Sequence, residues 1–162
     1  MNLVYLIIGV SGCGKSWVCR QLVDKFNYIA HDRCWKHPKA KPEEGLDPKW
    51  GPPGCESTHL ETILSEVKSS KKPIVTEIPF GERKFRENLE KEGIKVTPIF
   101  IIEDPKVVSS RYYAREGKHL PKPALTRATS IIERANEWEA VKGTSAEILE
   151  YLKNIKGDEE DV

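Results

Sequence analysis

The feature that most constrains the fold is a glycine-rich segment, GVSGCGKS at residues 9–16, which directly follows the apolar run LVYLII at residues 3–8. That run is short, bulky and rich in β-branched side chains, which is typical of a strand buried on both faces. From residue 15 onward, apolar residues recur at helical spacing. A strand, a glycine turn and a helix in this order predict a βα unit, and hence a sheet of the α/β class.

The glycine-rich segment matches G-x-x-x-x-G-K-[ST] in full, the pattern of a loop that holds nucleotide phosphates. Glycines let successive backbone N–H groups turn inward, where side chains would clash with phosphate oxygens. Lys15 is suited to reach the β- and γ-phosphates, and the Ser16 hydroxyl to ligate a magnesium ion. We therefore expect ATP and Mg²⁺ as cofactors, with Ser16 as the metal ligand. The expected nucleotide-binding residues are Gly9, Ser11, Gly12, Cys13, Gly14, Lys15, Ser16 and Trp17.

Strands and helices are expected to alternate along the remainder of the chain. The first helix should place Val18, Leu22 and Val23 on one face, and Asp104-Pro105 has the residue types of a helix N-cap and first helical position. The alternation predicts a three-layer αβα sandwich with a mostly parallel sheet. A fifth strand is the weak point, because only residues 139–142 are available for it. The expected strands are 3–8, 28–31, 73–78 and 96–102, and the expected helices are 15–26, 57–69, 82–92, 124–138 and 145–154, besides the one that begins at Pro105.

The composition predicts a globular protein. Of 162 residues, 38% are hydrophobic and 31% are charged, which suits one domain, expected at residues 1–157 with an acidic tail at 158–162. No apolar run approaches the roughly 20 residues that a membrane helix needs, and the N-terminus lacks the features of a signal peptide. A cytoplasmic location without a membrane partner is therefore expected. The four cysteines are then free thiols or metal ligands rather than a disulfide framework.

The segment SSRYYAREGKHLPKPALTRA has the pattern of an arginine lid, at about residues 108–122. Arg111 and Arg115 are four residues apart and so share one helix face, and the chain then breaks at Gly117 and Pro121. Guanidinium groups placed in this way can close on the charge that develops at a transferring phosphoryl group. The alternative is two solvated arginines on an ordinary helix. Together with the phosphate loop, the pattern favours phosphoryl transfer, with Lys15, Arg111 and Arg115 as catalytic candidates.

These motifs resemble the small P-loop kinases, a group that includes nucleoside monophosphate kinases, gluconate- and shikimate-type kinases and the kinase domain of polynucleotide kinases. The lid pattern R-x-x-x-R-x-G-K-x-L-P is most similar to the polynucleotide-kinase and zeta-toxin branch. The resemblance implies a P-loop NTPase fold and transfer of the γ-phosphate of ATP. It also implies that an Asp or Glu after the second strand serves as base for the substrate hydroxyl, and that GTSAEILEYL at residues 143–152 flanks adenine.

The stretch HDRCWKH at residues 31–37 follows the second expected strand and contains the favoured base, Asp32. In open α/β sheets, substrates bind at the carboxyl ends of the strands, where Asp32 is expected. A turn aspartate with no catalytic role is the alternative. Glu77 ends the third strand and is expected to face the same crevice, so which of the two carboxylates is the base stays open. The expected substrate-binding residues are Arg33, Trp35 and Glu77.

Residues 36–56 form a segment rich in proline, glycine and lysine, without periodic apolar residues, which predicts a long functional loop. Tryptophans interleaved with lysines suit base stacking and phosphate contact, although plain solubilising charge explains them equally well. A second hypothesis for this loop is a zinc site. The tryptophans and lysines are Trp35, Lys36, Lys39, Lys41, Lys49 and Trp50, and the possible zinc ligands are Cys34, His37, Cys55 and His59.

The expected acceptor is a hydroxyl or phosphate group on a nucleotide or nucleic acid. The resemblance also covers bacteriophage P-loop kinases that phosphorylate 5-hydroxymethyluracil within DNA, so a modified base is included. The net charge of +1, from 26 basic and 25 acidic residues, gives no general argument for nucleic acid, and such binding requires a local basic patch. The alternatives are a small-metabolite or nucleoside monophosphate kinase and a non-catalytic ATP-binding switch. The oligomeric state is left open.

Overall fold

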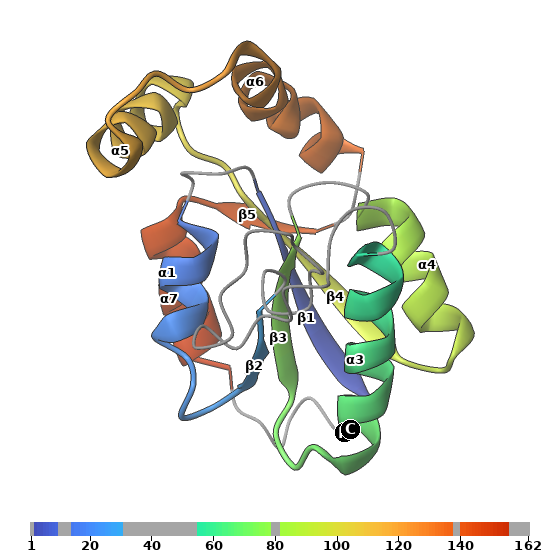
Figure 1. The fold of residues 1–162 in the computed structure, drawn as a ribbon. Coiled ribbons are helices and arrows are strands. Elements are labelled where there is room, and N and C mark those ends of the chain that lie inside the picture. Colours follow the sequence, from blue (N-terminus) through green and yellow to red (C-terminus); the bar gives the residue numbers. More distant parts are fainter. Residues whose placement is uncertain (1, 10–13, 31–54, 79–81, 138–139, 156–162) are drawn as a thin grey trace.

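The computed structural model describes residues 2–9, 14–30, 55–78, 82–137 and 140–155 (Figure 1). Their strands form a parallel five-stranded sheet in the order β2-β3-β1-β4-β5. The strands are β1 (Leu3–Ile8), β2 (Asn27–Ile29), β3 (Ile74–Ile78), β4 (Lys95–Ile101) and β5 (Val141–Gly143). The helices are α1 (Lys15–Arg20), α3 (Cys55–Ser69), α4 (Glu82–Lys91), α5 (Pro105–Glu116), α6 (Lys122–Asn136) and α7 (Ser145–Lys153).

The helices cover both faces of the sheet, which confirms the predicted three-layer αβα sandwich. Alternate side chains of β1 enter the two cores: Tyr5 and Ile7 pack on the side of α1 and α7, whereas Leu6 and Ile8 pack on the side of α3 and α4. All six residues of β1 are buried, as predicted for a strand covered on both faces. Helices α5 and α6 lie beyond the carboxyl end of the sheet (Figure 1). Among the described residues, no helix is long and apolar enough to cross a membrane.

The first helix is shorter than the sequence pattern predicted, because α1 ends at Arg20 rather than at residue 26. The chain continues in turns, in which the N–H of Leu22 bonds to the carbonyl of Cys19 and the N–H of Phe26 to that of Leu22. These turns bury Leu22 and Phe26 but leave Val23 51% exposed, so the prediction that Val23 shares one face with Val18 and Leu22 was wrong. The chain must reverse before β2 begins, and a longer helix would carry it past that strand.

The other element boundaries agree with the sequence patterns to within a few residues. The side chain of Asp104 accepts the N–H of Lys106 at 2.8 Å, and Pro105 is the first residue of α5, so the predicted N-cap is confirmed. Helix α3 begins at Cys55, inside the segment predicted to be a loop. The fifth strand exists as β5 and pairs with the end of β4, where Ile101 lies opposite Gly143.

Candidate active site

The strand β1 leads directly into the phosphate loop. The N–H of Gly9 bonds to the carbonyl of Ile78 at 3.3 Å, which fixes the start of the loop against β3. At the other end of the loop, two features of Gly14 explain why glycine is required there. Gly14 has φ 99°, a left-handed conformation that side chains disfavour. A Cβ on Gly14 would lie 2.9 Å from Cβ of Ser145, closer than two carbon atoms pack. The loop therefore enters α1 in a conformation that only glycine accommodates without strain.

The hydroxyl of Ser16, in the first turn of α1, donates a hydrogen bond to Glu77 Oε1 at 3.0 Å. The other carboxylate oxygen, Oε2, accepts from the hydroxyl of Tyr28 at 2.9 Å. Glu77 is 3% exposed, so these two bonds fix the orientation of a buried carboxylate. Burial, followed by the negative charge of Glu77, raises the pKa of Tyr28 well above its usual range. Tyr28 therefore stays protonated and acts as a donor.

The Ser16–Glu77 pair fits a magnesium ion through its chemistry. Mg²⁺ prefers oxygen ligands, keeps several waters and commonly binds through one or two carboxylates together with substrate phosphates. Ser16 and Glu77 provide a hydroxyl and a carboxylate side by side, next to the loop whose sequence predicts phosphate binding. Across the described residues there is no group of three or more His, Cys, Asp or Glu side chains that could hold a metal by themselves. This arrangement suits an ion that is shared with bound phosphates.

Arg111 of α5 lies beside the phosphate loop. Its Nη1 atom is 3.6 Å from the position that a Cβ on Gly14 would occupy and 3.5 Å from Glu103 Oε1. The same oxygen of Glu103 accepts both the backbone N–H and the hydroxyl of Ser145, at 3.0 and 2.9 Å. Glu103 therefore ties the end of β4 to the start of α7 and holds Arg111 between them.

Arg115 shares the helix but not this position. Its Nε atom is 3.0 Å from Glu116 Oε1, and its guanidinium lies over the ring of Tyr112, 5.5 Å from the ring centroid. The side chain of Arg115 is 57% exposed. Of the two predicted lid arginines, the structure thus brings Arg111 to the loop and leaves Arg115 on the outside of α5.

Of the remaining predicted site residues, the structure describes some, while others lie outside the described residues. Lys15 is the first residue of α1 and is partly buried, and Trp17 is 49% exposed on the same helix, so their contacts with a nucleotide stay predictions. Sequence reasoning missed Tyr28, whose only signal was a hydroxyl on an edge strand that leads to Asp32. Outside the described residues lie Ser11, Gly12, Cys13, Asp32, Arg33 and Trp35.

His59, one of the four possible zinc ligands, lies in the core. Its Nε2 atom is 2.7 Å from Thr76 Oγ1, and the hydroxyl of Thr76 donates to the carbonyl of Ile29 at 2.7 Å. Because that hydroxyl proton is already used, Nε2 of His59 is the donor in the first bond. The ring also stacks on Phe85, with centroids 4.8 Å apart. These contacts give His59 a structural role. Cys34, His37 and the side chain of Cys55 are not among the parts that the structure describes.

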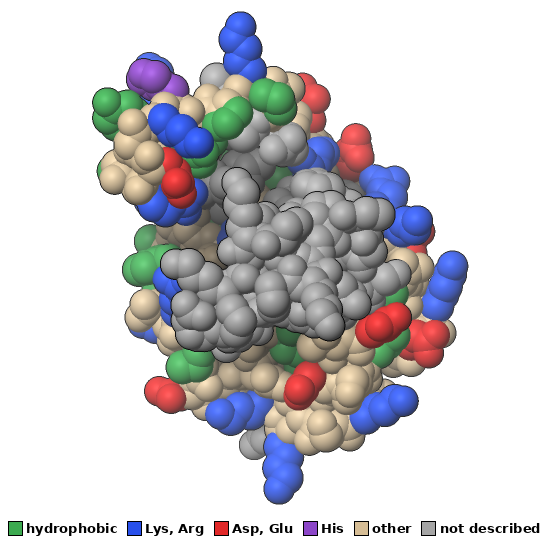
Figure 2. Space-filling view, in the orientation of Figure 1, with side chains coloured by type: hydrophobic (Ala, Val, Ile, Leu, Met, Phe, Trp, Pro, Cys, Tyr) green, Lys and Arg blue, Asp and Glu red, His purple; other side chains and the backbone are tan. Residues whose placement is uncertain are grey.

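The lid segment is rich in basic residues. Residues 105–123 contain five basic residues and one acidic residue, a net charge of +4 on a chain whose total is +1. Figure 2 shows Lys and Arg side chains over α5 and α6, among apolar and acidic ones, and further basic side chains around the rest of this face. The basic residues are Lys106, Arg111, Arg115, Lys118 and Lys122, and the acidic one is Glu116. The near-neutral total of the chain thus includes a locally basic segment.

Solved structures with this arrangement of elements include several kinases. A gluconokinase from Sinorhizobium meliloti 1021 matches with a TM-score of 0.59 and 24% identity, over 92% of this chain and 88% of that one. A shikimate kinase from Acinetobacter baumannii, solved with shikimate, matches with a TM-score of 0.55 and 15% identity, over 95% of each chain. The fold is that of the small P-loop kinases.

The tunicamycin resistance protein of Deinococcus radiodurans also matches this fold, with a TM-score of 0.68 and 13% identity over 93% of each chain. No protein-family model matches the chain, and neither does any curated protein. At sequence identities of 13% to 24%, these comparisons show the fold alone. The predicted P-loop NTPase architecture is therefore confirmed, while the polynucleotide-kinase branch stays a prediction.

Proposed function

We propose that the chain is a phosphotransferase that moves the γ-phosphate of ATP to an acceptor hydroxyl, with Mg²⁺ as cofactor. One observation carries the proposal: Ser16 is bonded to Glu77 while Arg111 lies against Gly14. Groups suited to the metal, the phosphates and the charge of the transferred group thus converge at the carboxyl end of the sheet. Ligands bind at this edge in open α/β folds, and phosphoryl transfer depends mainly on such positioning and electrostatics.

Each residue has a defined part in this reaction. ATP is the phosphoryl donor, and Mg²⁺, when bound, would neutralise part of the charge on its phosphates. Lys15 and the loop backbone hold the phosphates, Ser16 and Glu77 orient the metal shell, and Arg111 stabilises charge on the transferred group. We assign Asp32 as the base that takes the proton of the acceptor hydroxyl. The new oxygen–phosphorus bond replaces the bond to the β-phosphate oxygen, and ADP leaves.

We propose a nucleotide or nucleic-acid acceptor, including a hydroxymethylated base in DNA. The charge of +4 on residues 105–123 supports this acceptor, because phosphodiester backbones are bound mainly through Lys and Arg. The second candidate is a small-metabolite kinase, and the fold of the gluconokinase and of the shikimate kinase favours it.

An acceptor screen with γ-labelled ATP tests the proposal. Single- and double-stranded oligonucleotides, duplexes with 5-hydroxymethyluracil, mononucleotides, gluconate and shikimate are compared, with Lys15→Ala as the inactive control. Label on an oligonucleotide or nucleotide supports the preferred acceptor, and label on a metabolite supports the second candidate. ATP binding without transfer to any acceptor would instead indicate a binding module. If Asp32→Asn leaves transfer intact while Lys15→Ala abolishes it, the assignment of the base is wrong.

A further inference from the structure

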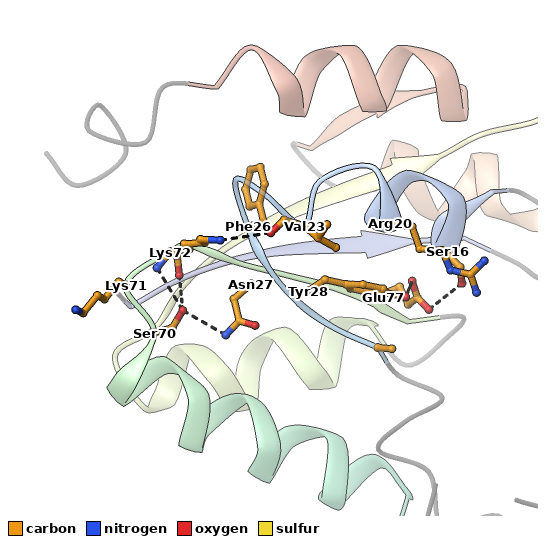
Figure 3. Close-up of a pocket in the computed structure, with 11 residues that line it drawn as sticks. Ser16, Arg20, Val23, Phe26, Asn27, Tyr28, Ser70, Lys71, Lys72 and Glu77 are labelled. Atoms are coloured by element: carbon orange, nitrogen blue, oxygen red, sulfur yellow. Dashed lines mark hydrogen bonds between the residues drawn. The ribbon is translucent and has the colours of Figure 1, made fainter. Parts of the chain in front are cut away.

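A pocket of about 680 Å³ opens between α1 and β2, on the side of the sheet that α1 and α7 cover (Figure 3). Its size falls in the range of about 300–1,000 Å³ that is usual for ligand sites. Ser16 and Glu77 line one end, and Lys71 and Lys72 line the other. The pocket is thus continuous with the site of phosphoryl transfer but extends well beyond it.

The end near the phosphate loop contains a cation without an assigned role. Arg20 lies one helical turn after Ser16 on α1, and Figure 3 shows its side chain extending toward Ser16 and Glu77. Within the part of the chain that the structure describes, Arg20 forms no ion pair and remains exposed. Glu77 is already bonded to Ser16 and to Tyr28. The guanidinium of Arg20 is therefore available to an incoming anion.

The far end presents two lysines on a turn with a fixed shape. The hydroxyl of Ser70 donates to the carbonyl of Lys72 at 2.7 Å and accepts the N–H of Lys72 at 3.4 Å. The side-chain amide of Asn27 on β2 donates to the same hydroxyl at 3.3 Å. The ammonium group of Lys72 bonds to the carbonyl of Val23 at 3.4 Å. These bonds reduce the freedom of the turn, so less entropy is lost when its lysines bind a ligand.

The charges and the length of the pocket define the ligand. Three cations, Arg20, Lys71 and Lys72, outweigh the one carboxylate, Glu77, so the lining has a formal charge of +2 (3 − 1). Lys72 precedes β3 by two residues and Glu77 is the fourth residue of that strand, so the chain between them spans at most about 16 Å at about 3.3 Å per residue. A nucleic-acid strand can place anionic groups at both ends of such a span, because it carries one phosphate per nucleotide.

We infer that this pocket binds the phosphodiester backbone of a nucleic-acid acceptor, next to the nucleotide that receives the phosphate. Arg20 contacts a phosphate near the reacting end, and Lys71 and Lys72 contact phosphates at the far end. This inference rests on the proposed phosphotransferase function and deepens it by assigning the acceptor strand a path along the edge strand β2.

The first experiment measures binding without catalysis. A fluorescent single-stranded oligonucleotide is titrated with the wild type and with Arg20→Gln/Lys71→Gln/Lys72→Gln, and anisotropy is recorded at several salt concentrations. We expect the triple variant to bind at least about ten-fold more weakly, and its log–log salt slope to fall by about 2, since each phosphate contact on a single strand contributes about 0.7. The matched control is Lys68→Gln/Lys84→Gln/Lys91→Gln, three exposed lysines of α3 and α4. Equal affinity and slope in the triple variant and the wild type would overturn the inference.

The second experiment separates this inference from the proposed function. In the labelled-ATP assay, Arg20→Gln and Lys72→Gln should raise KM for the oligonucleotide far more than KM for ATP, whereas Lys68→Gln should change neither. Phosphorylation of oligonucleotides with an unchanged acceptor KM in these variants would refute the pocket and leave the function standing. Oligonucleotide binding that depends on the three cations, without any phosphorylation, would support the pocket and refute the acceptor.

Discussion

The hydroxyl of Tyr28 donates to Glu77 Oε2 at 2.9 Å, so a tyrosine on the edge strand β2 fixes the carboxylate that faces the phosphate loop. The two residues come from neighbouring strands, with Tyr28 opposite Val75, two residues before Glu77. Glu77 Oε1 accepts from Ser16. The bond from Tyr28 to Oε2 therefore fixes the orientation in which Oε1 faces Ser16. Tyr28 is therefore a positioning residue for the Ser16–Glu77 pair.

Tyr28→Phe should weaken the use of magnesium. The substitution keeps the ring but leaves Glu77 Oε2 without this donor in a buried position. Loss of a hydrogen-bond partner behind a metal site typically costs about 10–100-fold in metal affinity or activity. The measurement is the rate of phosphoryl transfer against Mg²⁺ concentration, in which half-saturation should shift upward by about ten-fold or more.

Two comparisons sharpen this test. Tyr5→Phe removes a hydroxyl from another buried tyrosine, which packs edge-to-face on Phe26, and should leave the magnesium curve in place. Because burial and Glu77 raise the pKa of Tyr28, its proton stays bound through the neutral range. The ratio of wild-type to Tyr28→Phe rates should thus be constant from about pH 6 to about pH 9. A magnesium curve that coincides with the wild type would show that Tyr28 has no such role.

Gly14→Ala should destabilise the protein and impair ATP binding. Both the left-handed φ of 99° and the 2.9 Å approach to Ser145 oppose a side chain there. The matched control is Gly93→Ala, because Gly93 has φ 79° and nothing within 4 Å of its Cβ position. Gly93→Ala should lose about 1–2 kcal/mol of unfolding free energy from the backbone alone, and Gly14→Ala should lose more. Urea denaturation and ATP titration of both variants measure this, and equal losses with unchanged ATP affinity would contradict it.

The sequence predicted the fold best where a local rule acts alone. The continuous apolar run of β1 and the Asp104-Pro105 cap both specify their elements without help from distant residues. The end of α1 was missed because helical spacing continues beyond Arg20, whereas the chain has to turn back toward β2. That requirement comes from the position of β3, and no residue near Arg20 encodes it.

In the candidate site too, the sequence predicted the features that depend on neighbouring residues and missed those that depend on distant ones. Helical spacing correctly put Arg111 and Arg115 on one helix, but it could not tell which of them lies over the loop. The choice depends on where β4 ends and on Glu103, which contacts Ser145 on α7 as well as Arg111. Glu77 was predicted to face the crevice from its place at the end of β3. Its bond to Tyr28 joins residues 49 positions apart and follows only from the pairing of β2 with β3.

Arg111→Ala should reduce transfer far more than Arg115→Ala. Arg111 lies at the loop, while Arg115 is paired with Glu116 and is 57% exposed. Removal of one donor that stabilises transition-state charge costs about 100–1,000-fold in kcat, and we expect Arg111→Ala to fall in this range. The measurement is kcat for each variant at saturating ATP. A larger loss for Arg115→Ala would mean that Arg115, rather than Arg111, acts on the phosphoryl group.

Glu147→Gln should reduce stability near neutral pH, with an effect that disappears in acid. Glu147 closes a capping box at the start of α7: its Oε1 accepts the N–H of Thr144 at 3.0 Å, and its own N–H donates to the Thr144 hydroxyl at 3.3 Å. The backbone hydrogen bond from Thr144, and then its side-chain bond, lower the pKa of Glu147.

A group whose pKa is depressed in the folded state stabilises the fold above its unfolded pKa and loses that contribution as pH falls through its folded pKa. The difference in Tm between the wild type and Glu147→Gln should therefore be largest near about pH 7 and shrink toward about pH 3. Thermal unfolding over this range measures it, with Glu87→Gln on the exposed face of α4 as the control for loss of a surface charge. A difference that stays constant with pH would show that the ionised form of Glu147 stabilises the start of α7 no more than the protonated form does.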